Sequence, residues 1–338
     1  MLPQLIARYF SDLDATLREM VDSHPKLPDD FAVMIRYAMG WVNEHGNPYN
    51  KPTGKRIRPL LLLLCTEASG GNWRQALPAA AAVELLHNFS LIHDDIEDDS
   101  PTRHGRPTVW KLWGEANAIN AGDALFTISF HALQKLAQSG LQAERILEIW
   151  DVFNQTTIEL TRGQHLDMRF EHQDSVSVDE YLSMIAGKSA ALVSACSRIG
   201  ALVTTDNQST IQAYADFGLN LGIAFQIRDD ILGIWGDPAV TGKSAATDIL
   251  SRKKSLPVIY ALAKSEALTE IYARETLGDA DVTEALAALE AVEARTYTES
   301  YEEQYYEAAL RAIHTADPQG EAADWLMQLT RTLFHRDR

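Results

Sequence analysis

The sequence has few cysteines and no long hydrophobic run. Only Cys65 and Cys196 occur among 338 residues, and both lie in apolar, helix-like segments. Two such thiols do not form a disulfide framework and fit buried, reduced cysteines, so we expect a cytoplasmic protein. The longest apolar run, Leu60 to Cys65, is far too short to cross a bilayer. The N-terminal amphipathic pattern also lacks the layout of a signal peptide, and we expect no transmembrane segment.

Basic residues are outnumbered. The chain has 30 Lys and Arg residues against 47 Asp and Glu residues, which gives a formal net charge of −17. This balance excludes nonspecific binding to nucleic acid. The apolar content of 46% is enough for a large core. We expect part of the acidic excess to gather at metal sites.

The sequence also lacks the signals of β-strands. It has no run in which apolar and polar residues alternate, and no turn-forming dipeptide between two β-branched segments. Helical periodicity dominates instead, and the Ala/Glu-rich stretch 278–300 is expected at the periphery. The pattern predicts an all-α protein in which residues 1–338 form one domain, a single large helical bundle. The expected helical segments are 73–99, 116–138, 141–170, 178–202, 210–235 and 256–271.

Two acidic clusters on apolar helical stretches stand out. The first contains Asp94, Asp95 and Asp98, and the second contains Asp229 and Asp230. Asp94 and Asp98 share a helix face, and carboxylates about 6 Å apart repel by roughly 3 kcal/mol at an effective dielectric near 20. Ligand sets made only of oxygen favour a hard cation, so the clusters predict bound Mg²⁺. Mg²⁺ fills its shell with substrate phosphates, which indicates a diphosphate ligand.

Basic residues accompany each acidic cluster. Lys55 and Arg58 are three apart at the start of an apolar helix, where a phosphate is attracted by both charge and helix dipole. Arg56 fits a solvated loop position. Arg103 follows the first cluster, and the cations that follow the second are Lys243, Lys253 and Lys254. The pattern predicts anionic ligand oxygens over the metals.

Together these motifs resemble the trans-isoprenyl diphosphate synthases, the polyprenyl synthetase family. The resemblance spans about residues 54–257 and is specific because the motifs occur in the family's order. They are the segment Gly54 to Pro59, the Asp94/Asp95/Asp98 pattern, the segment Arg103 to Thr108, Lys188-Ser189, and the Phe-Gln-x-x-Asp-Asp segment that starts at Phe225. The resemblance implies central helices around a deep apolar cavity, and a homodimer.

The resemblance also implies a reaction, in which an allylic diphosphate ionises and the double bond of isopentenyl diphosphate attacks the cation head to tail. Catalysis would come from metal ions that neutralise the leaving diphosphate in a dry pocket, with about three Mg²⁺ ions held. The implied metal ligands are Asp94, Asp95, Asp98, Asp229 and Asp230. The allylic diphosphate would contact Arg103, Lys188, Lys243 and Lys253, and isopentenyl diphosphate would contact Lys55, Arg58 and His87. Ser189 and Gln226 would lie near the carbocation, with Gln164 and Asp167 in the Gly-Gln-x-x-Asp segment.

Two positions depart from the family pattern. Gly233 stands where a third aspartate normally closes the second motif, although Asp237 lies close downstream. His104 replaces an arginine that contacts isopentenyl diphosphate in many members, so we expect weaker and more pH-dependent binding there.

Product length follows from the side chain that blocks the pocket below the first cluster. Phe89 lies five residues before Asp94, about 7.5 Å along a helix. By resemblance, this aromatic residue indicates a geranylgeranyl (C20) synthase. Ser90 lacks the second aromatic residue of some farnesyl (C15) synthases.

Two alternatives remain open at this point. A type I terpene cyclase shares the bundle and the first motif, but it has no need of Lys55, Arg58 and His87. A noncatalytic subunit of a heteromeric synthase typically loses aspartates, whereas Asp94, Asp95 and Asp98 are all present. The missing aspartate at Gly233 keeps the second alternative open.

Overall fold

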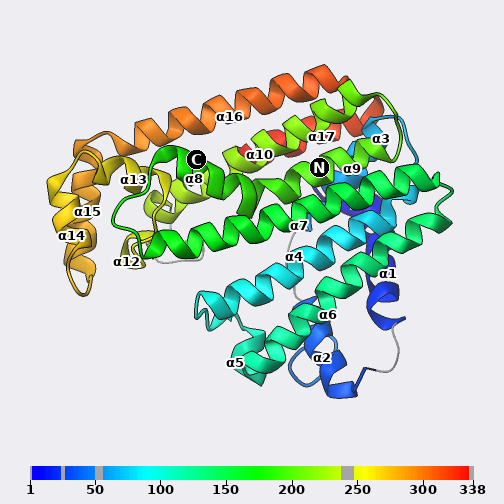
Figure 1. Cartoon of the computed structure of the whole chain (residues 1–338), viewed down its shortest axis with the longest axis horizontal. Coiled ribbons are helices and arrows are strands. Elements are labelled where there is room, and N and C mark those ends of the chain that lie inside the picture. The colour runs from blue at the N-terminus through cyan, green and yellow to red at the C-terminus, as the bar shows by residue number, and fades with distance from the viewer. Residues whose placement is uncertain (1, 24–26, 50–55, 237–246, 335–338) are drawn as a thin grey trace. The chain divides into compact units, whose positions relative to one another are not determined.

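The computed structural model describes residues 2–23, 27–49, 56–236 and 247–334, and most of these residues are helical (Figure 1). The predicted all-α class is confirmed. Contacts group the chain into two compact units that interleave along the sequence. The first comprises 1–150, 199–205 and 319–325, and the second comprises 151–198, 206–318 and 326–338. The prediction of one domain over 1–338 stays a prediction.

The first half of the chain supplies most of the first unit. Its elements are α1 (Leu2–Asp22), α2 (Asp29–Ala38), α3 (Ile57–Ala68), η1 (Trp73–Ala76), α4 (Leu77–Glu97), β1 (Thr102–Arg103), β2 (Arg106–Pro107), α5 (Val109–Trp113), α6 (Glu115–Gln134) and η2 (Lys135–Gln138).

The helix α7 (Ala143–Glu171) carries the chain into the second unit. The elements that follow are α8 (Val178–Ile185), the π-helical turn η3 (Ala186–Ala190), α9 (Ala191–Leu202), α10 (Gln208–Trp235), α12 (Thr247–Leu250), α13 (Leu256–Leu262), α14 (Glu266–Tyr272), α15 (Asp279–Ala291), α16 (Ala294–Ala316) and α17 (Gly320–Phe334).

Small residues let α4 and α6 pack closely, and the two helices run side by side in Figure 1. The alanines at 79–82 are fully buried. A Cβ at Gly122 of α6 would lie only 2.4 Å from the His93 ring of α4, so a larger residue there would have to displace this ring. This packing fixes the helix that carries the first acidic cluster.

The second unit is built on α10 and α16, which pack along much of their length (Figure 1). Between them lies a buried ion pair, with Arg228 Nε 2.7 Å from Glu302 Oε1. Arg228 Nη2 also donates to the Phe334 carbonyl at 3.1 Å. The Phe334 ring in turn stacks on Tyr306 with centroids 3.8 Å apart. The end of α17 is thereby tied to α10 beside Asp229.

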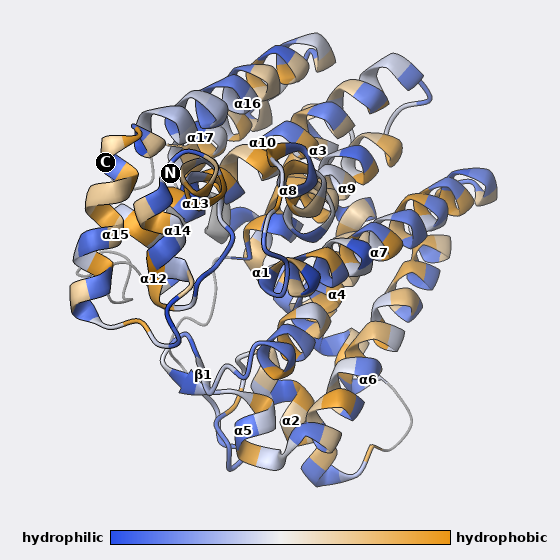
Figure 2. Ribbon diagram, turned by 60° about the vertical axis from the view of Figure 1, so that its left-hand side comes forward, coloured by the Kyte–Doolittle hydropathy of each residue, from blue (hydrophilic) through white to orange (hydrophobic). Residues whose placement is uncertain are grey.

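Three details differ from the sequence-based expectations. A two-stranded hairpin follows α4, because His104 and Gly105 both adopt positive φ (51° and 72°) and form its two-residue turn. Hydrophilic residues dominate this hairpin (Figure 2). The segment 256–271 is two helices rather than one, with Ser265 capping the second.

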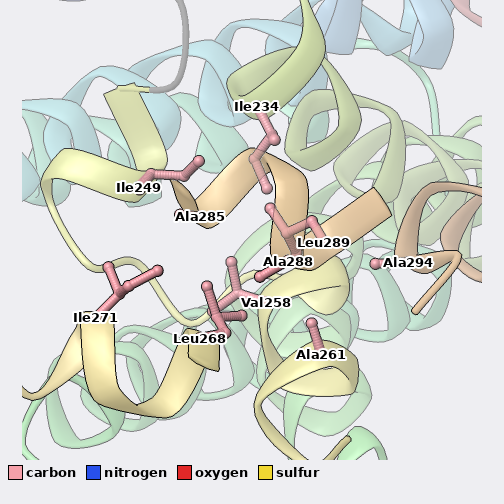
Figure 3. Packing of buried hydrophobic residues seen from close by; sticks show 10 residues of the cluster. All are labelled: Ile234, Ile249, Val258, Ala261, Leu268, Ile271, Ala285, Ala288, Leu289 and Ala294. Carbon is pink, nitrogen blue, oxygen red and sulfur yellow. The ribbon is translucent and has the colours of Figure 1, made fainter. Parts of the chain in front are cut away.

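The third difference concerns α15, which was expected at the periphery. Its Ala285, Ala288 and Leu289 belong to a buried hydrophobic cluster with Ile234 of α10 and Ile249 of α12 (Figure 3). The polar residues beside them face solvent. Because the stretch is rich in Ala and Glu, its composition does not signal that one face of the helix is apolar and buried.

Candidate active site

The first acidic cluster lies at the C-terminal end of α4. Asp94 is half-buried in the last turn, and Asp98 is the C-cap, whose backbone N–H donates to the Asp94 carbonyl at 2.9 Å. The negative end of the helix dipole and the neighbouring carboxylates repel one another here, and the last turn contains no basic residue. This helix end is therefore suited to a divalent cation.

Asp95 has a different environment from Asp94. It is 5% exposed and accepts a hydrogen bond from Arg103 Nε at 2.8 Å. Burial raises the pKa of Asp95, and the Arg103 guanidinium opposes this rise. A small cavity of about 70 Å³ lies beside the pair and is lined in part by Asn88 and the exposed His104. Asp95 thus orients Arg103, which was predicted to contact a diphosphate.

The predicted isopentenyl diphosphate residues Arg58 and His87 come together. Arg58, in the first turn of α3, places Nη1 3.1 Å from His87 Nε2 on α4. Desolvation, followed by the charge of Arg58, lowers the pKa of His87 well below its usual value. His87 is therefore neutral at physiological pH, and its Nε2 accepts from the guanidinium.

The depressed pKa of His87 predicts a pH-dependent stability. The unfolded chain takes up a proton near pH 6.5 and the folded chain does not, so acidification favours unfolding. Between pH 7.5 and 5.5 the wild type should lose about 1.4 kcal/mol more of its unfolding free energy than His87→Gln. Urea denaturation at both pH values measures the difference. The exposed His45→Gln is the control and should behave as the wild type. Equal pH dependence in His87→Gln and wild type would contradict a neutral His87.

Two arginines close in sequence to the predicted diphosphate-binding residues, Arg56 and Arg106, contact other parts of the protein. Arg56, expected in a solvated position, is largely covered, with its side chain 10% exposed. It pairs with Asp14 of α1 at 2.7 Å, and its guanidinium lies over the Phe10 ring. The expectation was wrong because α1 covers the start of α3. Arg106 donates to the Val42 carbonyl at 2.8 Å and stacks on Tyr37.

An aromatic row continues from the predicted chain-length residue. The Phe89 ring lies 5.0 Å from Phe126 of α6, which lies 5.1 Å from Phe130. Phe130 in turn contacts Trp150, with centroids 5.9 Å apart. Ser90 donates its hydroxyl to the His87 carbonyl. Phe126 and Phe130 were not predicted, because the register between α4 and α6 is needed to place them beneath Phe89.

In the second unit, Asp230 is fully buried, and both of its carboxylate oxygens accept hydrogen bonds. Its Oδ1 accepts from Gln226 Nε2 at 3.2 Å and lies 3.4 Å from Lys253 Nζ. Its Oδ2 accepts from the Tyr181 hydroxyl and from the Leu256 backbone N–H. Burial raises the pKa of Tyr181 well above its usual value, so this residue stays a donor. Both oxygens of Asp230 are thus engaged, while its neighbour Asp229 is half-buried.

Lys188 and Ser189 lie in the π-helical turn η3. Lys188 pairs with Asp167 of α7, and Ser189 donates to Gln226 Oε1 at 2.6 Å. A Cβ at Gly163 of α7 would lie 2.0 Å from the Lys188 backbone nitrogen, so glycine allows the close approach. The turn therefore joins four of the predicted site residues, a role that π-turns often have at functional sites.

Lys253 completes the described part of this half-site. Burial disfavours its charge, but the carboxylates of Asp230, Asp248 and Asp167 raise its pKa above the usual value. Lys55, Lys243 and Asp237 lie outside the described residues. Within the described ranges, no three Asp, Glu, His or Cys side chains already form a set that could hold a metal ion. Ligand oxygens would therefore have to complete the shell, as Mg²⁺ usually requires.

Two residues of this half-site, Tyr181 and Asp248, were not predicted from the sequence. Tyr181 lies 49 residues from the carboxylate that it contacts, and no local pattern links the two. Separately, none of the helices in the part of the chain that the structure describes is both long and apolar enough to cross a membrane.

Comparison with known proteins shows the family of the chain. The family model of polyprenyl synthetases matches residues 39–289. The chain is 42% identical over 248 residues to a farnesyl diphosphate synthase of Mycobacterium tuberculosis, covering 73% of this chain and 67% of that protein. It is 41% identical over 270 residues to a geranylgeranyl diphosphate synthase of the same organism, covering 80% and 75%.

Solved structures show the same likeness over the whole chain. A polyprenyl synthetase from Streptomyces coelicolor superposes with a TM-score of 0.89 and 34% identity, covering 98% of this chain and 99% of that one. A geranylgeranyl pyrophosphate synthetase from Pyrococcus horikoshii gives a TM-score of 0.88, 32% identity and 99% coverage of both chains. The chain therefore belongs to the polyprenyl synthetase family and is a prenyltransferase.

Proposed function

We propose that this enzyme condenses isopentenyl diphosphate with an allylic diphosphate, head to tail and with Mg²⁺, to give a short-chain trans-polyprenyl diphosphate. The observation that carries the proposal is the acidic C-terminal end of α4, with Arg103 and the Arg58–His87 pair in the same unit. Carboxylates for a cation and guanidinium groups for phosphate suit a metal diphosphate. From the family resemblance we also propose that the enzyme is a homodimer and acts in the cytoplasm.

The reaction breaks the allylic carbon–oxygen bond, and the diphosphate leaves with the electron pair. The double bond of isopentenyl diphosphate attacks the carbocation, and a proton is then lost to the departing diphosphate. Bound Mg²⁺ would supply Lewis-acid neutralisation of the leaving group. In this proposal the protein's own task is to hold the diphosphates and to keep water from the carbocation.

The structure refines which carboxylates we propose as direct metal ligands. Asp95 is held by Arg103, and Asp230 is held by four donors. Because their oxygens are held in this way, we give Asp95 and Asp230 positioning roles. Asp94, Asp98 and Asp229 stay the proposed ligands, as the family resemblance implies. We propose that Lys188 and Lys253 bind the allylic diphosphate. From the sequence motifs alone, we propose that Lys243 binds it too and that Lys55 binds isopentenyl diphosphate. Ser189 and Gln226 form a dipolar pair, which suits a place near a carbocation.

A product assay tests the proposal. The enzyme is incubated with Mg²⁺, labelled isopentenyl diphosphate and dimethylallyl, geranyl or farnesyl diphosphate, and the products are sized. We expect extension of at least one primer, with C20 as the main product, and no extension when EDTA is present. No extension of any primer would overturn the proposal, and a cyclised hydrocarbon would favour a cyclase.

Product length should depend on Phe89. We expect Phe89→Ala to lengthen the main product by one isoprene unit, because truncation opens space against Phe126. The double variant with Phe126→Ala should lengthen it further, since Phe130 is the next barrier. Phe31→Ala, on α2, is the control and should leave the distribution unchanged. An unchanged product from Phe89→Ala would reject this residue as the floor.

A further inference from the structure

The second acidic motif lacks its third carboxylate because position 233 is glycine. Gly233 lies one helical turn after Asp229 on α10, so both positions share a face. On the proposed function, this face holds a metal ion with Asp229. A missing carboxylate there would leave the second motif weaker than the first, where Asp94 and Asp98 have the same spacing.

The space beside Gly233 is filled by another aspartate. A Cβ built at Gly233 would lie 2.4 Å from Asp248 Oδ2, 2.6 Å from Asp248 Cγ and 3.0 Å from Asp248 Oδ1. In an aspartate, standard bond lengths place each Oδ about 2.4 Å from its own Cβ. The Asp248 carboxylate therefore lies close to the place that the carboxylate of an aspartate at 233 would take.

Local packing fixes Asp248 at this position. Its neighbour Ile249 is fully buried in the cluster that contains Ile234, the residue after Gly233 (Figure 3). Lys253 Nζ lies 3.8 Å from Asp248 Oδ2 and 3.4 Å from Asp230 Oδ1. The Lys253 backbone N–H also donates to the Asp248 carbonyl at 2.9 Å. An apolar anchor and a cation thus hold the carboxylate against α10.

We propose that Asp248 supplies the third carboxylate of the second motif, and that Gly233 is required because it leaves room for Asp248. This inference rests on the proposed function. It makes a prediction opposite to that of sequence comparison alone. Restoring the usual aspartate at 233 should impair the site rather than improve it, because two carboxylates would occupy one space.

A reciprocal exchange tests the inference. The probe is Mg²⁺ with inorganic diphosphate, and the readout is the Mg²⁺ concentration that gives half of the thermal stabilisation of the protein. We expect Asp248→Asn to raise this concentration about tenfold or more. Gly233→Asp should raise it as well, and the double variant with Asp248→Ala should return to within about threefold of the wild type. Asp216→Asn, an exposed site on α10, is the control and should match the wild type.

Each outcome decides the inference. Wild-type Mg²⁺ dependence in Asp248→Asn would overturn it, as would a double variant that stays as weak as Asp248→Asn. Absence of Mg²⁺-diphosphate binding by the wild type would also overturn it. If Gly233→Asp does not fold, Asp248→Asn still decides between the two outcomes, because it preserves the shape of the side chain.

The inference and the proposed function can fail separately. If the wild type extends no primer but binds Mg²⁺ with diphosphate through Asp248, the function is wrong and the role of Asp248 stands. If the wild type elongates prenyl chains while Asp248→Asn keeps the wild-type Mg²⁺ dependence, the function stands and the role of Asp248 is wrong.

Discussion

Replacing Asp94 by Asn should lower the rate of condensation by about a thousandfold or more, which corresponds to about 4 kcal/mol of transition-state stabilisation. Asp94 lies half-buried at the negative end of α4, where we propose that it holds Mg²⁺ against the leaving diphosphate. The amide keeps the shape of the side chain but removes the charge that binds a hard cation. The measurement is kcat with saturating substrates and Mg²⁺.

The same substitution should leave the fold intact or strengthen it. Removing one negative charge from the end of the helix dipole is expected to add about 0.3–1 kcal/mol to the free energy of unfolding. Loss of activity together with equal or higher stability marks a residue kept for function. The exposed Asp151→Asn, on α7, is the control and should change kcat less than twofold. An active Asp94→Asn enzyme would remove Asp94 from the metal site.

Replacing Glu302 by Ala should destabilise the protein by about 3–5 kcal/mol, because it leaves Arg228 buried without its carboxylate partner. The two side chains are only 5% and 2% exposed, with Arg228 Nε 2.7 Å from Glu302 Oε1. With an unfolding entropy of about 2.1 cal/mol/K per residue, this loss lowers Tm by roughly 4–7 °C. Differential scanning calorimetry measures the shift.

A double replacement separates the cost of burying a lone charge from the value of the pair. Arg228→Met with Glu302→Leu should recover most of the lost stability, since two apolar side chains need no partner. Glu303→Ala, an exposed position on the same helix, should stay within about 0.5 kcal/mol of the wild type. A Glu302→Ala protein as stable as that control would show that the pair is not needed.

The sequence predicted the helices well, because helical periodicity is a local signal, and both acidic clusters lie on helices as expected. The spacing of apolar residues sets the helix faces, and Asp94 and Asp98 keep their one-turn relation even though Asp98 is the C-cap. The hairpin at 102–107 escaped prediction because its turn uses His104 at positive φ, which the sequence does not signal.

The different environments of adjacent aspartates could not be predicted. Most of the hydrogen bonds that hold Asp95 and Asp230 come from residues outside their own motifs. Arg103 lies eight residues from Asp95, and Tyr181 lies 49 residues from Asp230. The contact between Gly233 and Asp248 likewise depends on how α12 packs against α10.

The π-helical turn at 186–190 has a consequence for how the motif tolerates insertions and deletions. A π-turn takes one more residue than an α-turn, so everything beyond it is rotated by about 100° relative to an unbroken helix. If the turn closed into a regular α-helix with no change in residue number, Lys188 would rotate away from Asp167 and Ser189 away from Gln226. Deleting one residue of the turn, such as Ala186, would cancel this rotation, because the loss of one residue turns the following helix by the same angle in the opposite sense. The number of residues ahead of this motif and the π-turn therefore have to match, and a change in one without the other would displace the site.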